Sequence, residues 1–286
     1  MHALGQTGLI LEGGGMRGAY TAGVLAFFHD AELQFPYVVG TSAGACVATS
    51  YLSNQRDRNY EVFVKYASHP EYISYKRLLT KRQLFGMDFI FDTVPNQLVP
   101  YDYEAFNKQT TKLVIGATDI YSGKPVYYDS FENKKELLKI VRASSSLPFI
   151  ASSISHNGLE LMDGGISAPI PIMQSIEAGN QKHVVVLTRN EGYVKKEMKF
   201  KRLVQRKYKA YPGLVTALLK RHEKYNQTID LLHELEKKQE IFIIRPKLPL
   251  VVSRIERNMQ KLDALYNQGY EEAKQLGGKL QIFLNQ

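Results

Sequence analysis

The sequence predicts an α/β protein built on a mostly parallel sheet that is covered by helices. Short apolar runs alternate with segments of helical apolar spacing through the first half of the chain. Residues 8–11 and 37–39 have the pattern of buried strands, and each is followed by a glycine-rich turn and a predicted helix, over 19–33 and 43–52 respectively. The length of 286 residues is sufficient for one such domain with a sizeable core.

The remaining elements follow in chain order. Residues 75–106 lack a regular period and are rich in aromatic side chains, which is typical of a lid or a binding loop and equally of a core. Regular patterns then return as a hairpin, a helix, two further strands and a helical C-terminal third with one short strand: 112–117, 125–128, 134–142, 159–162, 183–187, 214–238, 241–244 and 255–276. We therefore expect a core of residues 1–190 and a mostly helical extension of residues 191–286 packed on the same domain.

Positive charge is concentrated in one segment. The formal net charge is +9, and Lys195–Lys209 holds eight Lys and Arg residues against the single Glu197. This segment suits either a solvated basic surface or peripheral contact with anionic lipid headgroups. No recognisable nucleic-acid module surrounds it, so we expect no nucleic-acid partner.

Cysteine usage and hydropathy indicate a compartment. Cys46 is the only cysteine, which rules out an intrachain disulfide and a cysteine-based metal site and fits a reducing cytosol. The sequence has neither a signal-peptide pattern at its start nor an uninterrupted apolar stretch of about 18 residues. We expect a cytoplasmic protein that is at most peripheral to the inner face of the membrane.

A serine lies on a predicted turn between a strand and a helix. The turn comprises Gly40, Thr41, Ser42, Ala43 and Gly44. A nucleophilic serine needs such a turn, because its strained backbone brings chain segments close together and glycines two positions away remove the clashes. The pattern alone arises by chance in many chains, but its place between a strand and a helix is the context that the chemistry requires.

A glycine cluster follows the first predicted strand and comprises Gly13, Gly14, Gly15, Met16, Arg17 and Gly18. Backbone N–H groups at a helix start suit an oxyanion, since losing one such donor costs about 3–4 kcal/mol of transition-state stabilisation. The spacing also matches a dinucleotide-binding fingerprint, which requires an acidic residue at the end of the next strand. That strand is followed by the serine turn, and Glu32 lies on the preceding predicted helix. The pattern therefore favours an oxyanion over a pyrophosphate.

Asp163, Gly164 and Gly165 follow another predicted strand. Alone they signal only a turn, but the two glycines let the aspartate approach a serine hydroxyl closely enough to act as its base. Ser42, Asp163 and His183 also occur in the chain order of a Ser-Asp-His triad. His183 begins an apolar strand, where a histidine more often caps or packs, and this favours the aspartate alone.

The conjunction of these motifs resembles the patatin-like phospholipase family of lipid acyl hydrolases. The segment Arg142–Pro148 also resembles that family's Ala-Ser-x-x-x-Pro segment, and the resemblance spans Thr7–Pro171. It implies a three-layer α/β/α fold and cleavage of lipid esters without a metal or cofactor. It also implies a dyad in which Ser42 is the nucleophile and Asp163 the base, with an oxyanion hole in the glycine cluster.

Two points stay open at this stage. The alternative to a lipid hydrolase is a non-catalytic membrane- or ligand-binding module on the same scaffold. On the hydrolase interpretation, residues 75–106 are candidates for an acyl-chain channel or lid, and a plain core role fits them equally. The sequence predicts neither the headgroup and chain length of the substrate nor the oligomeric state.

Overall fold

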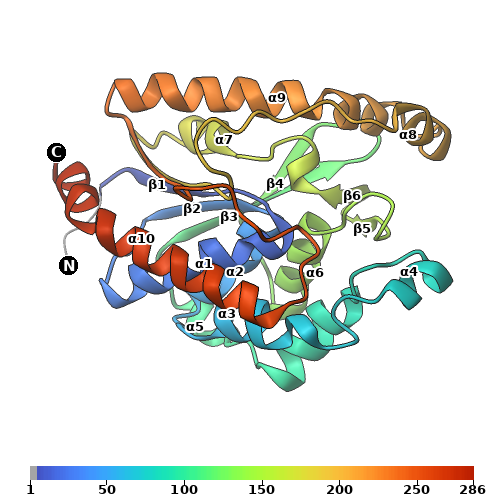
Figure 1. The fold of residues 1–286 in the computed structure, drawn as a ribbon, viewed down its shortest axis with the longest axis horizontal. Coiled ribbons are helices and arrows are strands. Elements are labelled where there is room, and N and C mark those ends of the chain that lie inside the picture. The colour runs from blue at the N-terminus through green and yellow to red at the C-terminus, as the bar shows by residue number, and fades with distance from the viewer. Residues whose placement is uncertain (1–4) are drawn as a thin grey trace.

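One mixed sheet of eight strands forms the centre of the protein in the computed structural model, which describes residues 5–286 (Figure 1). Its strand order is β5-β6-β3-β2-β1-β7-β8, and β4 pairs with β3 outside that path. The pairings among β3, β2, β1, β7 and β8 are parallel, while β4, β5 and β6 are antiparallel to their neighbours. The predicted α/β class with a mostly parallel sheet is confirmed. The strands are β1 Thr7–Leu11, β2 Tyr37–Thr41, β3 Lys112–Asp119, β4 Pro125–Tyr128, β5 Ile154–His156, β6 Leu159–Asp163, β7 Lys182–Val186 and β8 Ile241–Ile244.

Helices cover both faces of this sheet, which gives three layers. In Figure 1, α7 and α9 lie on one face, and α1, α2 and α6 lie on the other, with α10 packed on the outside of α1. Strands β1 and β2 are buried along their whole length, and β7 is buried from its second residue, because both faces of the sheet are covered. The helices are α1 Gly18–Asp30, α2 Ala43–Leu52, α3 Arg58–Tyr60, α4 Tyr75–Lys81, α5 Tyr103–Asn107, α6 Lys134–Ser144, α7 Ile172–Glu177, α8 Lys201–Lys207, α9 Pro212–Lys237 and α10 Met259–Asn285.

The segment expected to be irregular consists mostly of short helices. It contains α4, a helical stretch over Phe89–Leu98 and α5. The first and last begin at capping side chains: Ser74 accepts the N–H of Arg77 at 3.2 Å, and Asp102 accepts the N–H of Ala105 at 2.8 Å. These helices are too short for an apolar period to appear in the sequence.

The C-terminal segment completes the sheet and one of its layers. Strand β8 pairs in parallel with β7, and α10 packs along α1. The two helix backbones approach so closely that a Cβ atom added to Gly269 would lie 2.1 Å from the carbonyl oxygen of Tyr20. Beside this contact the hydroxyl of Tyr20 donates to the buried Glu272 at 2.8 Å.

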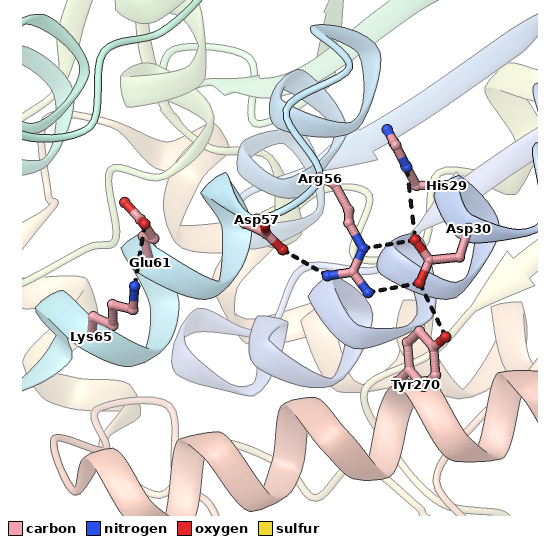
Figure 2. Close-up of polar contacts among 7 residues, drawn as sticks. All are labelled: His29, Asp30, Arg56, Asp57, Glu61, Lys65 and Tyr270. Atoms are coloured by element: carbon pink, nitrogen blue, oxygen red, sulfur yellow. Dashed lines mark hydrogen bonds and ion pairs between the residues drawn. The ribbon is translucent and has the colours of Figure 1, made fainter.

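Polar contacts fix the outer end of the same helix pair (Figure 2). Asp30, the last residue of α1, accepts hydrogen bonds of 2.7 and 2.6 Å from Arg56 and one of 3.0 Å from Tyr270 of α10. The hydrogen bonds from Arg56 hold the pKa of Asp30 below its usual value. The carboxylate therefore joins α1, the loop after α2 and α10.

Candidate active site

Ser42 lies at the end of β2, on the turn that enters α2. Its backbone has φ 55° and ψ −127°, a conformation that a side-chain-bearing residue adopts only when the surrounding structure enforces it. The glycines on either side allow the turn to be this tight. A Cβ atom on Gly44 would lie 2.3 Å from the carbonyl oxygen of Leu11, and one on Gly40 would lie 2.7 Å from the backbone of Gly44. The turn thus places Ser42 between β2 and α2, at the carboxyl end of the parallel strands.

The hydroxyl of Ser42 donates directly to a carboxylate. Its Oγ lies 2.7 Å from Oδ2 of Asp163, the last residue of β6, while Oδ1 of Asp163 accepts the N–H of Gly165 at 2.8 Å. Asp163 is 2% exposed, and this burial raises the pKa of its carboxyl, against the opposing effects of the Ser42 hydrogen bond and the charge of Arg221. A raised pKa makes the carboxylate a better proton acceptor than an exposed aspartate.

A second serine fixes the turn from below. Ser144, at the end of α6, accepts the backbone N–H of Ser42 at 2.8 Å and donates to the carbonyl of Gly116 in β3 at 2.6 Å. Ser144 belongs to the segment Arg142–Pro148, which resembles an Ala-Ser-x-x-x-Pro motif. Nothing in the sequence predicted its contact with Ser42. The bond holds the elbow in register with the neighbouring strand.

The glycine cluster lies beside the elbow, between β1 and α1. A short 3₁₀ turn over Gly15–Arg17 precedes α1, so the N–H groups of Gly14 and Gly15 stand at a helical start, where the turn itself offers them no acceptor. Other members are engaged: Met16 donates its N–H to the carbonyl of Arg254 at 3.1 Å, and Gly13 donates to the carbonyl of Pro169 at 3.4 Å. Of the N–H groups predicted to hold an oxyanion, those of Gly14 and Gly15 are therefore the best candidates.

His183 and Ser42 lie at opposite ends of the parallel strands. His183 pairs with Gly8 near the start of two parallel strands, whereas Ser42 follows the end of β2. Its Nδ1 lies 3.0 Å from the hydroxyl of Ser175, and burial lowers its pKa to about 4. The length of the strands separates His183 from Ser42 and Asp163, which lie at the other end of the sheet. This histidine therefore cannot complete a Ser-Asp-His triad. Of the other histidines, His2 lies outside the described residues.

An apolar cavity of about 60 Å³ opens beside the serine. Its walls come from the elbow and the glycine cluster on one side and from the aromatic segment and α2 on the other; they include Ser42, Gly15, Met16, Cys46, Phe85 and Phe91. Only part of the aromatic segment reaches it, since Tyr101 and Phe106 pack together in the core under α2. Cys46 carried no signal for this position, and burial raises the pKa of its thiol to about 11.

The basic segment divides into two parts. Lys195 turns inward, with its Nζ 4.6 Å from the centroid of the Tyr225 ring, and burial lowers its pKa to about 6. The seven other Lys and Arg residues of the segment are exposed on and around α8. Exposed apolar side chains, Phe200 and Leu203, lie among them.

The part of the chain that the structure describes, residues 5–286, also bears on metal binding and membrane insertion. That part of the chain has no group of three or more His, Cys, Asp or Glu side chains arranged to hold a metal ion. None of its helices is both long enough and apolar enough to cross a membrane.

The fold and the site together define an α/β protein in which a serine hydroxyl on a strand-to-helix turn donates to a buried carboxylate. Residues 9–176 match the family model described as patatin-like phospholipase, which covers more than half of the chain. The chain therefore belongs to the patatin-like phospholipase family, as its motifs predicted. A second model, described only as a domain of unknown function (DUF6363), matches residues 211–285.

Curated relatives differ in how much of their length this chain spans. It is 29% identical over 253 residues to the uncharacterized protein YjjU of Escherichia coli, covering 86% of this chain and 70% of that protein. It is 23% identical to triacylglycerol lipase 5 of Saccharomyces cerevisiae, covering 64% of this chain and 29% of the lipase. It is also 23% identical to lysophospholipase NTE1 of Candida albicans, covering 94% of this chain and 20% of that enzyme.

Proposed function

We propose that the protein is a lipid acyl hydrolase that cleaves ester bonds of glycerolipids through an acyl-Ser42 intermediate. The observation that carries this proposal is the 2.7 Å hydrogen bond from Ser42 to the buried Asp163 at the mouth of an apolar cavity. Family membership supports hydrolysis of lipid esters, and two relatives bear the names of a triacylglycerol lipase and a lysophospholipase.

The first half of the reaction makes the acyl-enzyme. Oγ of Ser42 attacks the ester carbonyl carbon while Asp163 takes the hydroxyl proton. The negative charge on the former carbonyl oxygen is stabilised by the N–H groups of Gly14 and Gly15. The bond to the alcohol oxygen then breaks, and Asp163 returns the proton to the departing alcohol.

The second half releases the fatty acid. A water molecule attacks the acyl ester as Asp163 accepts one of its protons, and the bond to Oγ breaks with return of that proton to Ser42. The acyl chain occupies the apolar cavity during both halves. Because its walls expose few polar atoms, the cavity excludes water from the chain but provides no contact that selects an alcohol.

Hydrolysis of p-nitrophenyl esters and of phospholipid and triacylglycerol emulsions tests the proposal. Ser42→Ala should abolish turnover, and Asp163→Asn should lower kcat/KM by about 10²–10⁴-fold. His183→Asn, which changes a buried histidine at the far sheet edge, is the control and should retain turnover. A wild-type protein with no activity on any ester and no adduct with a fluorophosphonate would instead indicate a non-catalytic lipid-binding module.

The exposed part of the basic segment is proposed to bring the enzyme to anionic membranes. Its cations surround Phe200, which is 70% exposed, and this combination suits the interface of an anionic bilayer. Sedimentation with vesicles should show binding that rises with anionic lipid content and falls with salt. Lys196→Gln with Lys199→Gln should weaken it, whereas the matched pair Lys274→Gln with Lys279→Gln on α10 should not.

A further inference from the structure

Four arginines and one lysine lie around the glycine cluster and Asp163; because burial lowers the pKa of the lysine, Lys195, to about 6, the positive charge at neutral pH comes from the arginines. Four of them lie beyond the part of the chain that matches the lipase family, on the loop after β7, before α8, on α9 and before α10: Arg189, Lys195, Arg221 and Arg254. The fifth, Arg17, belongs to the glycine cluster and is 3% exposed. Of these five residues, only Arg17 lies in one of the site motifs predicted from the sequence.

Direct contacts attach the cluster to the catalytic loops. Arg221 donates from Nε to the carbonyl of Gly165, two residues after the catalytic aspartate. The carbonyl of Arg254 accepts the N–H of Met16, which places Arg254 against the glycine cluster. These contacts hold Arg221 next to the loop after Asp163 and Arg254 next to the glycine cluster.

Aromatic rings contact the other two side chains, Arg189 and Lys195. The guanidinium of Arg189 lies 4.3 Å from the ring centroid of Tyr193, and Nζ of Lys195 lies 4.6 Å from that of Tyr225. The two rings meet edge to face, with centroids 5.9 Å apart. Arg189 and Lys195 therefore each lie over a ring, and the two rings contact each other.

Positive charge exceeds negative charge in this region. Two acids, Glu12 and Asp163, interact with these cations, and both already have hydrogen-bond partners. Oε2 of Glu12 accepts the N–H and the hydroxyl of Thr188, and Asp163 accepts the hydroxyl of Ser42. Within residues 5–286 the ion pairs involve other cations, and Nε of Arg17 has no hydrogen-bond partner. Burial of like charges is costly unless an anion compensates it.

The titration behaviour agrees with an uncompensated cluster. Burial first, and then the charges of Arg254 and Arg189, lower the pKa of Arg17 to about 10. Burial and Arg254 lower the pKa of Arg221 to about 10 as well. An anion bound among these groups would relieve both effects.

We propose that this cluster binds a phosphate group, and that the group is the headgroup phosphate of the lipid whose ester Ser42 cleaves. This inference rests on the proposed function and selects phospholipids within it. Ser42 lies between the two parts of such a substrate, since the apolar cavity is built from α2 and the aromatic segment on one face of the sheet, whereas Arg221 comes from α9 on the other (Figure 1). Guanidinium groups suit phosphate because their paired N–H donors match its oxygens.

The test compares two substrates that differ only in the headgroup: a short-chain phosphatidylcholine below its micelle concentration and the diacylglycerol with the same chains. Arg189→Gln with Arg254→Gln should lower the ratio of kcat/KM for phospholipid over diacylglycerol by about tenfold or more. The control pair Lys274→Gln with Lys279→Gln removes equal charge from exposed positions and should leave the ratio unchanged. An equal fall for both substrates would overturn the proposal, because it would indicate a purely structural role.

A binding arm separates this inference from the hydrolase proposal, because it needs no turnover. In the Ser42→Ala protein, inorganic phosphate should raise Tm, and the Arg189→Gln/Arg254→Gln change should remove that rise. No effect of phosphate on Tm would contradict the anion site even if the enzyme hydrolyses lipids. Phosphate protection that the double change removes, together with an unchanged substrate ratio, would overturn the headgroup assignment in favour of free phosphate.

Discussion

The backbone N–H of Met16 donates a 3.1 Å hydrogen bond to the carbonyl oxygen of Arg254. The two residues are far apart in the chain, and the second lies in the region matched only by a domain of unknown function. The bond anchors the glycine cluster from outside the part of the chain that matches the family model. The C-terminal region is thereby part of the proposed active site as well as of the sheet.

Gly15→Ala should displace the glycine cluster from its position beside Ser42. Gly15 has φ 57°, and an added Cβ would lie 2.6 Å from the Arg254 carbonyl oxygen, so the loop must shift away from the oxyanion position. We expect kcat to fall by about 10²–10³-fold. Gly158→Ala is a matched control, because Gly158 also has positive φ but nothing lies within 4 Å of its added Cβ. Equal losses of kcat in the two variants would contradict this role of the contact.

The acid limb of the pH–rate profile should report Asp163. The aspartate acts as base only when ionised, and its pKa is raised above the usual value by burial, so kcat/KM should fall as pH drops through that raised pKa. The charge of Arg221 lowers this pKa. Arg221→Gln should therefore move the midpoint of the limb to higher pH.

His183 is the control for this assignment because its own pKa is lowered to about 4. His183→Asn should leave the midpoint of the acid limb where it is in the wild type. A midpoint that moves with His183 and not with Arg221 would show that another group controls the limb.

Cys46 should control the acyl-chain length that the cavity accepts. Cys46→Phe fills space beside Ser42, so kcat/KM for p-nitrophenyl decanoate should fall about tenfold or more relative to the butyrate. Cys46→Ala keeps the space and should leave the ratio close to that of the wild type. A ratio that Cys46→Phe does not change would place the acyl chain elsewhere.

Gly269→Ala should weaken the packing of α10 on α1. The added Cβ would meet the backbone of Tyr20 at 2.1 Å, and we expect a loss of about 1–3 kcal/mol or more in the free energy of unfolding, measured by urea denaturation. Gly278→Ala on the same helix meets nothing within 4 Å and should stabilise the protein by about 0.5–1 kcal/mol. A similar effect of both changes would contradict the close packing of the two helices.

Local sequence was sufficient for the elements whose signals lie within a few residues. The serine turn and Asp163-Gly164-Gly165 are such signals, because each depends on glycines next to the functional residue. The start of α10 was placed too early, since the cap by Asn258, which accepts the N–H of Lys261 at 3.0 Å, lies inside the expected helix. Strand β5 was missed because three residues are too few to show an alternating pattern.

Residues brought to the site by tertiary structure had no comparable signal. Ser144 lies at the end of an ordinary amphipathic helix, and Arg221 lies within a long helix rich in charged residues. They lie near Ser42 only because the sheet order places β3 beside β2 and because α9 covers the face of the sheet opposite α2. A single sequence contains no periodicity that encodes this proximity.

The central claim is that Ser42 is a nucleophile activated by Asp163 without a histidine. The most direct measurement is the rate at which a fluorophosphonate forms an adduct, with the labelled residue identified by peptide mass spectrometry. We predict that the adduct forms on Ser42, that Asp163→Asn slows its formation by about 10²-fold or more, and that His183→Asn leaves the rate near that of the wild type. Labelling of Ser42 at the wild-type rate in Asp163→Asn, or no adduct on Ser42 in the wild-type protein, would contradict the account.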